Sequence, residues 1–88
     1  MAGVFVPSLM QKLTSGQERV TVEGANVRQV INNLETAFPG FKERVLDETG
    51  QVQEGIAIAV DGSTSHLGLI EPVSDTTEVH FIPAIGGG

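Results

Sequence analysis

Hydrophobic and polar residues follow two different periods along this chain, and these periods predict its elements. Residues 18–23 alternate charged or hydroxyl side chains with valines, which is the period-two pattern of a half-buried strand. Residues 4–6 are β-branched and aromatic, so we expect them to form a strand that pairs with residues 18–23 in a hairpin. Pro7 cannot donate a backbone hydrogen bond, so pairing on one side should stop or bulge there.

One apolar stripe at helical spacing predicts the main helix. Its members occur at i, i+3, i+4, i+7 and i+11, which places them on one face of a helix: Val27, Val30, Ile31, Leu34 and Phe38. Asn26 is a suitable N-cap, and Gln29 can reach back as in a capping box. Pro39 and Gly40 should end the helix, and residues 41–46 could add a short helical turn.

The second half of the chain reads as strands separated by turns. Residues 56–60 are apolar at every position, which indicates a strand in the interior of a sheet. Asp61-Gly62 is a turn signal, and residues 63–66 could form a short strand before a polar turn at residues 74–77. The order of elements fits one mixed sheet packed on one helix, with the last strand beside the first.

Composition narrows the class of protein. The chain has 88 residues, which corresponds to one small domain over residues 1–88, and its net charge of −6 argues against nucleic-acid binding. It contains no cysteine, so thiol nucleophiles, thiolate metal sites and disulfides are excluded. There is no signal-peptide pattern and no apolar run of membrane-spanning length, so we expect a soluble, cytoplasmic protein without a membrane partner.

Catalytic motifs are missing from the sequence. His66 and His80 are the only histidines, and two ligands without a supporting cluster make a poor metal site. On the last strand His80 alternates with apolar neighbours, so it should face solvent. Neither a nucleophile elbow nor a phosphate-binding glycine loop occurs. We therefore predict no catalytic residue, no bound metal and no bound cofactor, and a chain that is not itself an enzyme.

The end of the sequence carries the candidate chemistry. The apolar strand Val79 to Ile85 runs directly into Gly86, Gly87 and Gly88. Glycine lacks a Cβ atom, so residues 86–88 should form a thin, flexible tail that can enter a narrow site. We interpret the Gly88 carboxylate as the functional group and the strand before it as its handle.

With these features together, the chain resembles the MoaD/ThiS family of ubiquitin-like sulfur carriers, in particular its MoaD-like and CysO-like branch. The terminal pair Gly87-Gly88 after an apolar strand carries most of the resemblance. The turn at Val60-Asp61-Gly62 and the start at Pro7 and Leu9 add to it. The chain departs from the family at residues 75–77, where Asp-Thr-Thr stands in place of the usual Asp-Gly-Asp, although a type I turn tolerates threonine.

The resemblance implies an α+β protein with a ubiquitin-like β-grasp fold, in which a mixed sheet of four to five strands packs on one main helix. It also implies a role for Gly88. A ubiquitin-activating-type, MoeB/ThiF-like adenylyltransferase would adenylate the Gly88 carboxylate, and the ATP would be used by that partner. A sulfur donor would then give a thiocarboxylate, and a sulfur-accepting synthase would use it.

Docking onto the partner is predicted for the residues next to the tail. These are Phe81, Pro83, Ala84 and Ile85, and Phe81 is also a candidate for the core. Three other functions stay open: the small subunit of molybdopterin synthase, a ubiquitin-like protein modifier, and an inert binding module. The resemblance leaves the sulfur-receiving pathway open between molybdopterin, cysteine and thiamin.

Overall fold

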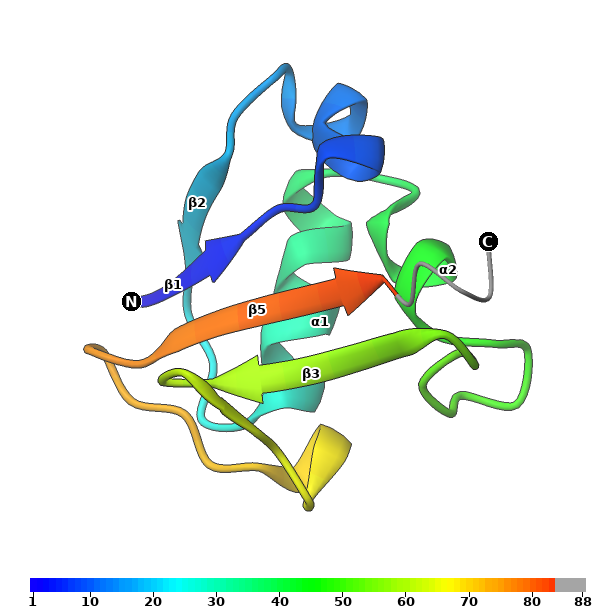
Figure 1. Ribbon diagram of the computed structural model, residues 1–88. Helices are drawn as coiled ribbons and strands as arrows, with labels where there is room; N and C mark the ends of the chain where they lie inside the picture. Colours follow the sequence, from blue (N-terminus) through cyan, green and yellow to red (C-terminus); the bar gives the residue numbers. More distant parts are fainter. Residues whose placement is uncertain (84–88) are drawn as a thin grey trace.

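The computed structural model describes residues 1–83, and residues 84–88 lie outside the described part. Figure 1 shows the arrangement of the elements. In chain order they are β1 (Ala2–Phe5), the 3₁₀ helix η1 (Ser8–Thr14), β2 (Arg19–Val22), α1 (Val27–Ala37), α2 (Phe41–Val45), β3 (Ile56–Val60), β4 (Ser63–Thr64), the 3₁₀ helix η2 (Gly68–Ile70) and β5 (Glu78–Pro83).

Within residues 1–83, five strands form one mixed sheet in the order β2-β1-β5-β3-β4. Strands β1 and β2 are the antiparallel hairpin predicted from the sequence, and β5 lies parallel to β1. On its other side β5 pairs antiparallel with β3, and β3 in turn pairs with β4. The predicted β-grasp fold, with the last strand beside the first, is confirmed.

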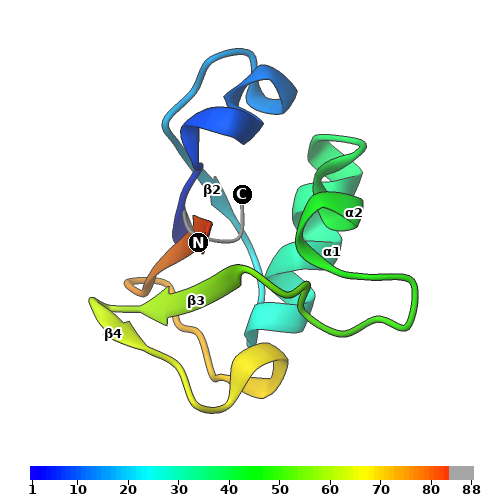
Figure 2. The same ribbon diagram turned by 45° about the vertical axis from the view of Figure 1, so that its right-hand side comes forward.

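Helices α1 and α2 lie on one side of the sheet (Figures 1 and 2), and the core fills the space between. Alternate strand residues point into this core, among them Val4, Val79 and Ile58. The helices contribute Val30, Ile31, Leu34 and Phe41, all 0% exposed. Among residues 1–83, no helix covers the opposite face of the sheet, so the side chains there form an outward face. Figure 1 looks onto that face.

Helix α1 begins and ends as its sequence predicts. The Asn26 side chain accepts a hydrogen bond from the Gln29 N–H at 2.9 Å, which caps the first turn. The Gln29 side chain reaches back to the Ala25 N–H at 2.8 Å, one residue earlier than a standard capping box would place it. Gly40 has a φ of +100°, a left-handed value that lets the chain turn from α1 into α2.

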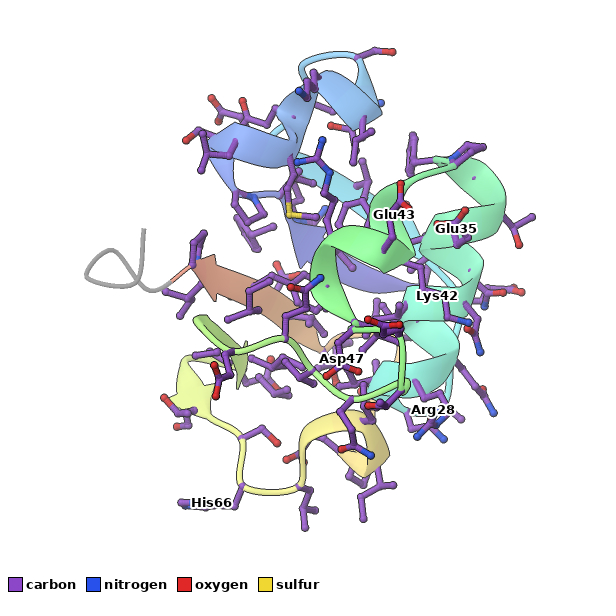
Figure 3. The ribbon with its side chains drawn as sticks, turned by 90° about the vertical axis from the view of Figure 1, so that its right-hand side faces the viewer. Arg28, Glu35, Lys42, Glu43, Asp47 and His66 are labelled. Carbon is purple, nitrogen blue, oxygen red and sulfur yellow. The ribbon has the colours of Figure 1, made fainter. Side chains whose placement is uncertain are left out.

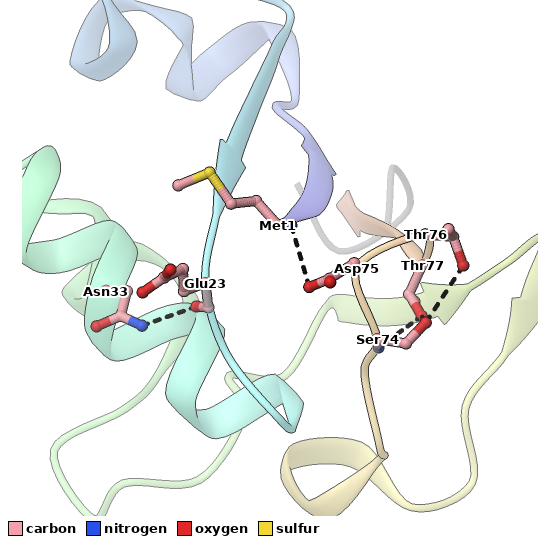
Figure 4. A network of polar contacts seen from close by, with 7 residues as sticks. All are labelled: Met1, Glu23, Asn33, Ser74, Asp75, Thr76 and Thr77. Carbon is pink, nitrogen blue, oxygen red and sulfur yellow. Dashed lines mark hydrogen bonds and ion pairs between the residues drawn. The ribbon is translucent and has the colours of Figure 1, made fainter.

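A compact turn over residues 74–77 feeds the chain into β5. The Thr77 N–H donates to the Ser74 carbonyl at 3.1 Å, and the Thr77 hydroxyl accepts from the Ser74 N–H at 2.9 Å. Figure 4 shows this network together with the ion pair between Asp75 and the Met1 amino group. The turn closes without a positive φ at any of these residues, so threonine serves here where a glycine is usual.

Strand β3 occupies the predicted interior position, between β5 and β4. Its two outward positions differ in exposure. Ile58 points into the core and is 5% exposed, and outward-facing Ala59, between His80 and Thr64, is only 6% exposed, whereas outward-facing Ala57 is exposed. The continuous apolar run therefore predicted the place of the strand in the sheet but not the exposure of Ala57.

Candidate functional site

Strand β5 leaves the core at its C-terminal end. Val79 and Phe81 point inward and are 0% and 3% exposed, while Ile82 is 48% exposed. Pro83 is also exposed, and it is the last residue that the structure describes. Pairing with β3 continues to this point, since Pro83 lies opposite Ile56. The chain is therefore held in an extended form up to Pro83, and the predicted tail, residues 86–88, follows outside the described residues.

The predicted docking residues differ in exposure, and some of them lie outside the described residues. Phe81 is a core residue, and its ring packs edge-on against Phe41 with centroids 5.9 Å apart. Its side chain cannot form the partner contacts that we predicted for it, because it is buried beneath the sheet. Pro83 is exposed and keeps its predicted role as a hypothesis. Ala84 and Ile85, with the tail residues Gly86, Gly87 and Gly88, lie outside the described residues.

Ile82 is the docking candidate that the sequence analysis missed. It is a large aliphatic side chain on the outward face, directly before Pro83. Strict alternation along β5 would have identified it, because inward-pointing Phe81 requires its neighbour to point outward.

A single row of side chains crosses the outward face from one edge of the sheet to the other. The strand register places Arg19, Phe5, His80, Ala59 and Thr64 side by side, one from each of the five strands. The Phe5 and His80 rings are stacked, with centroids 4.2 Å apart and an angle of 5° between their planes. His80 points outward as predicted, but stacking leaves it half-buried rather than free in solvent.

Carboxylates on the helical side of the molecule bind the chain's own backbone (Figure 3). The backbone N–H groups of Lys42 and Gly40 donate to Glu35, and these bonds hold the pKa of Glu35 below its usual value. The Thr49 hydroxyl and the Gln51 N–H likewise lower the pKa of Asp47. The shallow hollow of about 820 Å³ beside them is lined largely by groups that already have partners.

The described residues offer neither a metal-ligand cluster nor a membrane-spanning helix. Within the described range 1–83, no three His, Cys, Asp or Glu residues are grouped so that they could hold a metal ion. Among the helices of that same range, none is long and apolar enough to cross a membrane.

The fold and the strand leading to the tail define a ubiquitin-like β-grasp protein. The sequence model of the ThiS family matches residues 4–88, so the chain belongs to the ThiS family. It is 29% identical to the sulfur carrier protein CysO of Mycobacterium tuberculosis, over 97% of this chain and 96% of that protein.

Solved structures agree with this assignment. The chain matches CysO in the crystal structure of the Amycolatopsis orientalis BexX/CysO complex with a TM-score of 0.91 and 27% identity, covering 100% of both chains. The solution structure of small archaeal modifier protein 1 from Methanosarcina acetivorans gives a TM-score of 0.81 at 21% identity, covering 99% of this chain and 95% of that one. This second likeness shows the fold alone. The chain is thus a CysO-like member of the ubiquitin-like sulfur carriers.

Proposed function

We propose that the Gly88 carboxylate of this chain is converted to a thiocarboxylate that donates sulfur in biosynthesis. The observation that carries the proposal is the match to the ThiS family over residues 4–88, which includes the terminal Gly87-Gly88 pair. The 29% identity to the sulfur carrier CysO supports it. In this role the chain is a substrate of other enzymes, and its chemistry requires an accessible carboxylate rather than catalytic side chains.

Activation must come first because a free carboxylate is a poor electrophile. An oxygen of the Gly88 carboxylate would attack the α-phosphorus of ATP on a MoeB/ThiF-like adenylyltransferase, and pyrophosphate would leave. Sulfide from a donor would then attack the acyl carbon of the adenylate. The C–O bond to AMP breaks, AMP leaves with the electron pair, and the thiocarboxylate remains as a nucleophile for the accepting synthase.

The similarity to CysO favours cysteine biosynthesis among the sulfur-receiving pathways that the family resemblance leaves open. The BexX/CysO complex supports the proposal that carriers of this kind assemble with partner proteins. We extend that to this chain, and place an adenylyltransferase, a sulfur donor and an accepting synthase among its partners.

Intact-protein mass spectrometry tests the role of Gly88. After incubation with the adenylyltransferase, ATP and a sulfide source, the native chain should gain the mass of one oxygen-to-sulfur exchange. A variant with one alanine added after Gly88 moves the carboxylate by about 3.3–3.6 Å along an extended chain. A misplacement of about 1 Å can cost on the order of a hundredfold in rate, so this variant and a Gly88 deletion should both fail.

Thermal melts of the same variants provide the control, because all three proteins should unfold at the same temperature. Thiocarboxylate formation by the alanine-extended protein at the native rate, without trimming, would show that Gly88 does not carry the chemistry. Adducts in which Gly88 is joined to a lysine of another protein would instead support the protein-modifier function.

A further inference from the structure

Strand β2 forms one edge of the sheet, and its outer side is unpaired. It lies at the end of the strand order, so among residues 1–83 only β1 pairs with it. The Val6 N–H donates to the Glu18 carbonyl across this pair. The Gly3 N–H instead turns away from β2 and donates to the Thr77 carbonyl. Thr21 lies opposite Gly3, so its backbone N–H and C=O groups point away from β1, toward the open edge.

The edge is open at Arg19 and Thr21. Within the described range 1–83, no hydrogen bond uses the backbone groups that these two residues turn away from β1. Just past the end of β2, the Glu23 carbonyl accepts a hydrogen bond from the Asn33 side chain of α1 at 2.7 Å (Figure 4). A carbonyl oxygen can accept two hydrogen bonds, so Glu23 keeps one for another strand. An unpaired row of this kind is a template for strand pairing.

The side chains along this edge are complementary to the same segment running in the opposite direction. Arg19, Thr21 and Glu23 are exposed, whereas Val20 and Val22 point into the core. Two copies paired antiparallel about Thr21 bring Arg19 of each opposite Glu23 of the other, because both lie two positions from Thr21. The same register sets Val20 opposite Val22 on the core side. A register centred on Arg19 would set two arginines against each other, which is destabilising.

Arg19 is held in place with donors to spare. Its Nη2 donates to both carboxylate oxygens of Glu78, at 3.0 and 3.2 Å, and the pair lies over Gly3, where a methyl group would overlap both side chains. The Arg19 side chain nevertheless stays 46% exposed. Among residues 1–83 its Nη1 and Nε groups have no hydrogen-bond partner, so they can receive the Glu23 carboxylate of a second copy.

We propose that β2 pairs antiparallel with β2 of a second copy of this chain, about a two-fold axis at Thr21, so that two sheets join into one. The contact is isologous and combines backbone hydrogen bonds at Thr21 with two ion pairs between Arg19 and Glu23. Because β2 has only four residues, the dimer is weak and forms at high protein concentration. β1 lies between β2 and β5, so the pairing does not use the strand that leads to the predicted tail and does not depend on the proposed function.

Sedimentation equilibrium of the full chain tests the pairing. In about 0.15 M salt, which screens the repulsion between two copies of net charge −6, the average mass should rise from 9.3 kDa toward twice that value between about 10 µM and about 1 mM protein. Thr21→Pro removes an N–H that faces the open edge, where a strand tolerates proline, so this variant should stay folded by thermal melt and monomeric. A native chain that stays at 9.3 kDa throughout would overturn the proposal.

Arg19→Glu and Glu23→Arg test the register. Each variant alone sets like charges opposite each other at both ends of the paired segment, so its dimer should be at least about tenfold weaker than the native one. An equimolar mixture restores opposite charges at both ends, and mixed dimers should form with an affinity within about threefold of the native value. Both variants keep a net negative charge, since one reversal changes −6 by two units, so attraction between oppositely charged proteins does not explain such a recovery.

Arg44→Glu is the matched control for Arg19→Glu. It makes the same change of charge at an exposed position of α2, away from β2 (Figure 1), and should change the dimer affinity by less than about twofold. Thermal melts check that each variant is folded before it is mixed. A mixture of Arg19→Glu and Glu23→Arg that associates no more tightly than either variant alone would contradict the register. Equal weakening by Arg44→Glu and Arg19→Glu would show that net charge, and not the edge of β2, controls association.

Discussion

Glu35 illustrates how a single carboxylate organises a turn between two helices. It accepts the Lys42 N–H at 2.8 Å and the Gly40 N–H at 3.2 Å, so it binds the first turn of α2 from the last turns of α1. These N–H groups have no partner inside α2 itself, because the first turn of any helix leaves its donors free. Hydrogen bonds to the charged form stabilise that form, and this is why the pKa of Glu35 is lowered.

The lowered pKa of Glu35 predicts a pH-dependent stability. A carboxylate whose pKa is lower in the folded than in the unfolded chain adds stability above its unfolded value, close to the ordinary 4.5. That contribution is lost as the pH falls through the folded value. Glu35→Gln should therefore lower the melting temperature at pH 7, and the difference from the native protein should shrink as the solution is acidified below about pH 4.

Glu48→Gln makes the same chemical change at an exposed position of the 47–55 loop and is the appropriate control. It should leave the melting temperature at pH 7 nearly unchanged. A Glu35→Gln deficit that stayed constant from pH 7 to strongly acidic solution would show that the charge of Glu35 contributes nothing.

Among single residues, the sequence analysis predicted local partners better than distant ones. The Asn26 cap lies within three positions of its partner Gln29, and it was predicted correctly. The Arg19–Glu78 pair joins residues 59 positions apart, and it requires both the strand order and the empty position at Gly3. Neither is visible in the local pattern, so the pair was found only from the structure.

At the scale of elements, α1 holds the sheet through one apolar stripe. Leu34 lies in the middle of that stripe and is 0% exposed. Leu34→Ala should lower the free energy of unfolding by about 2–5 kcal/mol, because it removes buried methyl groups and leaves a cavity. Urea unfolding followed by circular dichroism measures this as a fall in the midpoint at an unchanged slope.

Asn32→Ala is a suitable surface control for Leu34→Ala because Asn32 is exposed on α1. Its neighbour Asn33 is not suitable, since the Asn33 side chain donates a hydrogen bond to the Glu23 carbonyl at 2.7 Å (Figure 4). Similar urea midpoints for Leu34→Ala and Asn32→Ala would mean that α1 packs on the sheet differently from the structure described here.

Elements were predictable where a strong period coincided with clear boundary signals. Helix α1 has both, and the turn at Asp61 and Gly62 has the two positive φ angles that its sequence implies. The phase of β5 was predicted correctly at His80, which points outward, but it was not extended to Phe81 and Ile82. The sequence analysis chose docking residues by their closeness to the tail and not by alternation, so it included the buried Phe81 and left out Ile82, which is 48% exposed. Phe81 instead packs edge-on against Phe41 of α2.

At the scale of the whole molecule, the core of the described range 1–83 spans almost all of that range. Within residues 1–83, every buried apolar residue lies between Ala2 and Phe81. Removing residues 84–88 should therefore change the melting temperature by no more than about 2 °C, since surface changes usually alter stability by less than about 0.5 kcal/mol.

A longer truncation should behave differently. Removing residues 81–88 deletes Phe81, which is 3% exposed and packs on Phe41, and ends β5 halfway along β3. We expect this chain to show no cooperative melt by circular dichroism. If both truncated chains melted like the native protein, the C-terminal half of β5 would not belong to the core.

The central place of β5 has a mechanical consequence. β5 is hydrogen-bonded to β1 on one side and β3 on the other, and it is also the strand that leads to the predicted reactive end. A force applied at Pro83 along the strand axis acts across both ladders at once and loads them in shear, instead of opening one hydrogen bond at a time from an edge. An enzyme that pulled on this end of the chain would therefore have to break both hydrogen-bond ladders together, so the sheet should stay folded under that force.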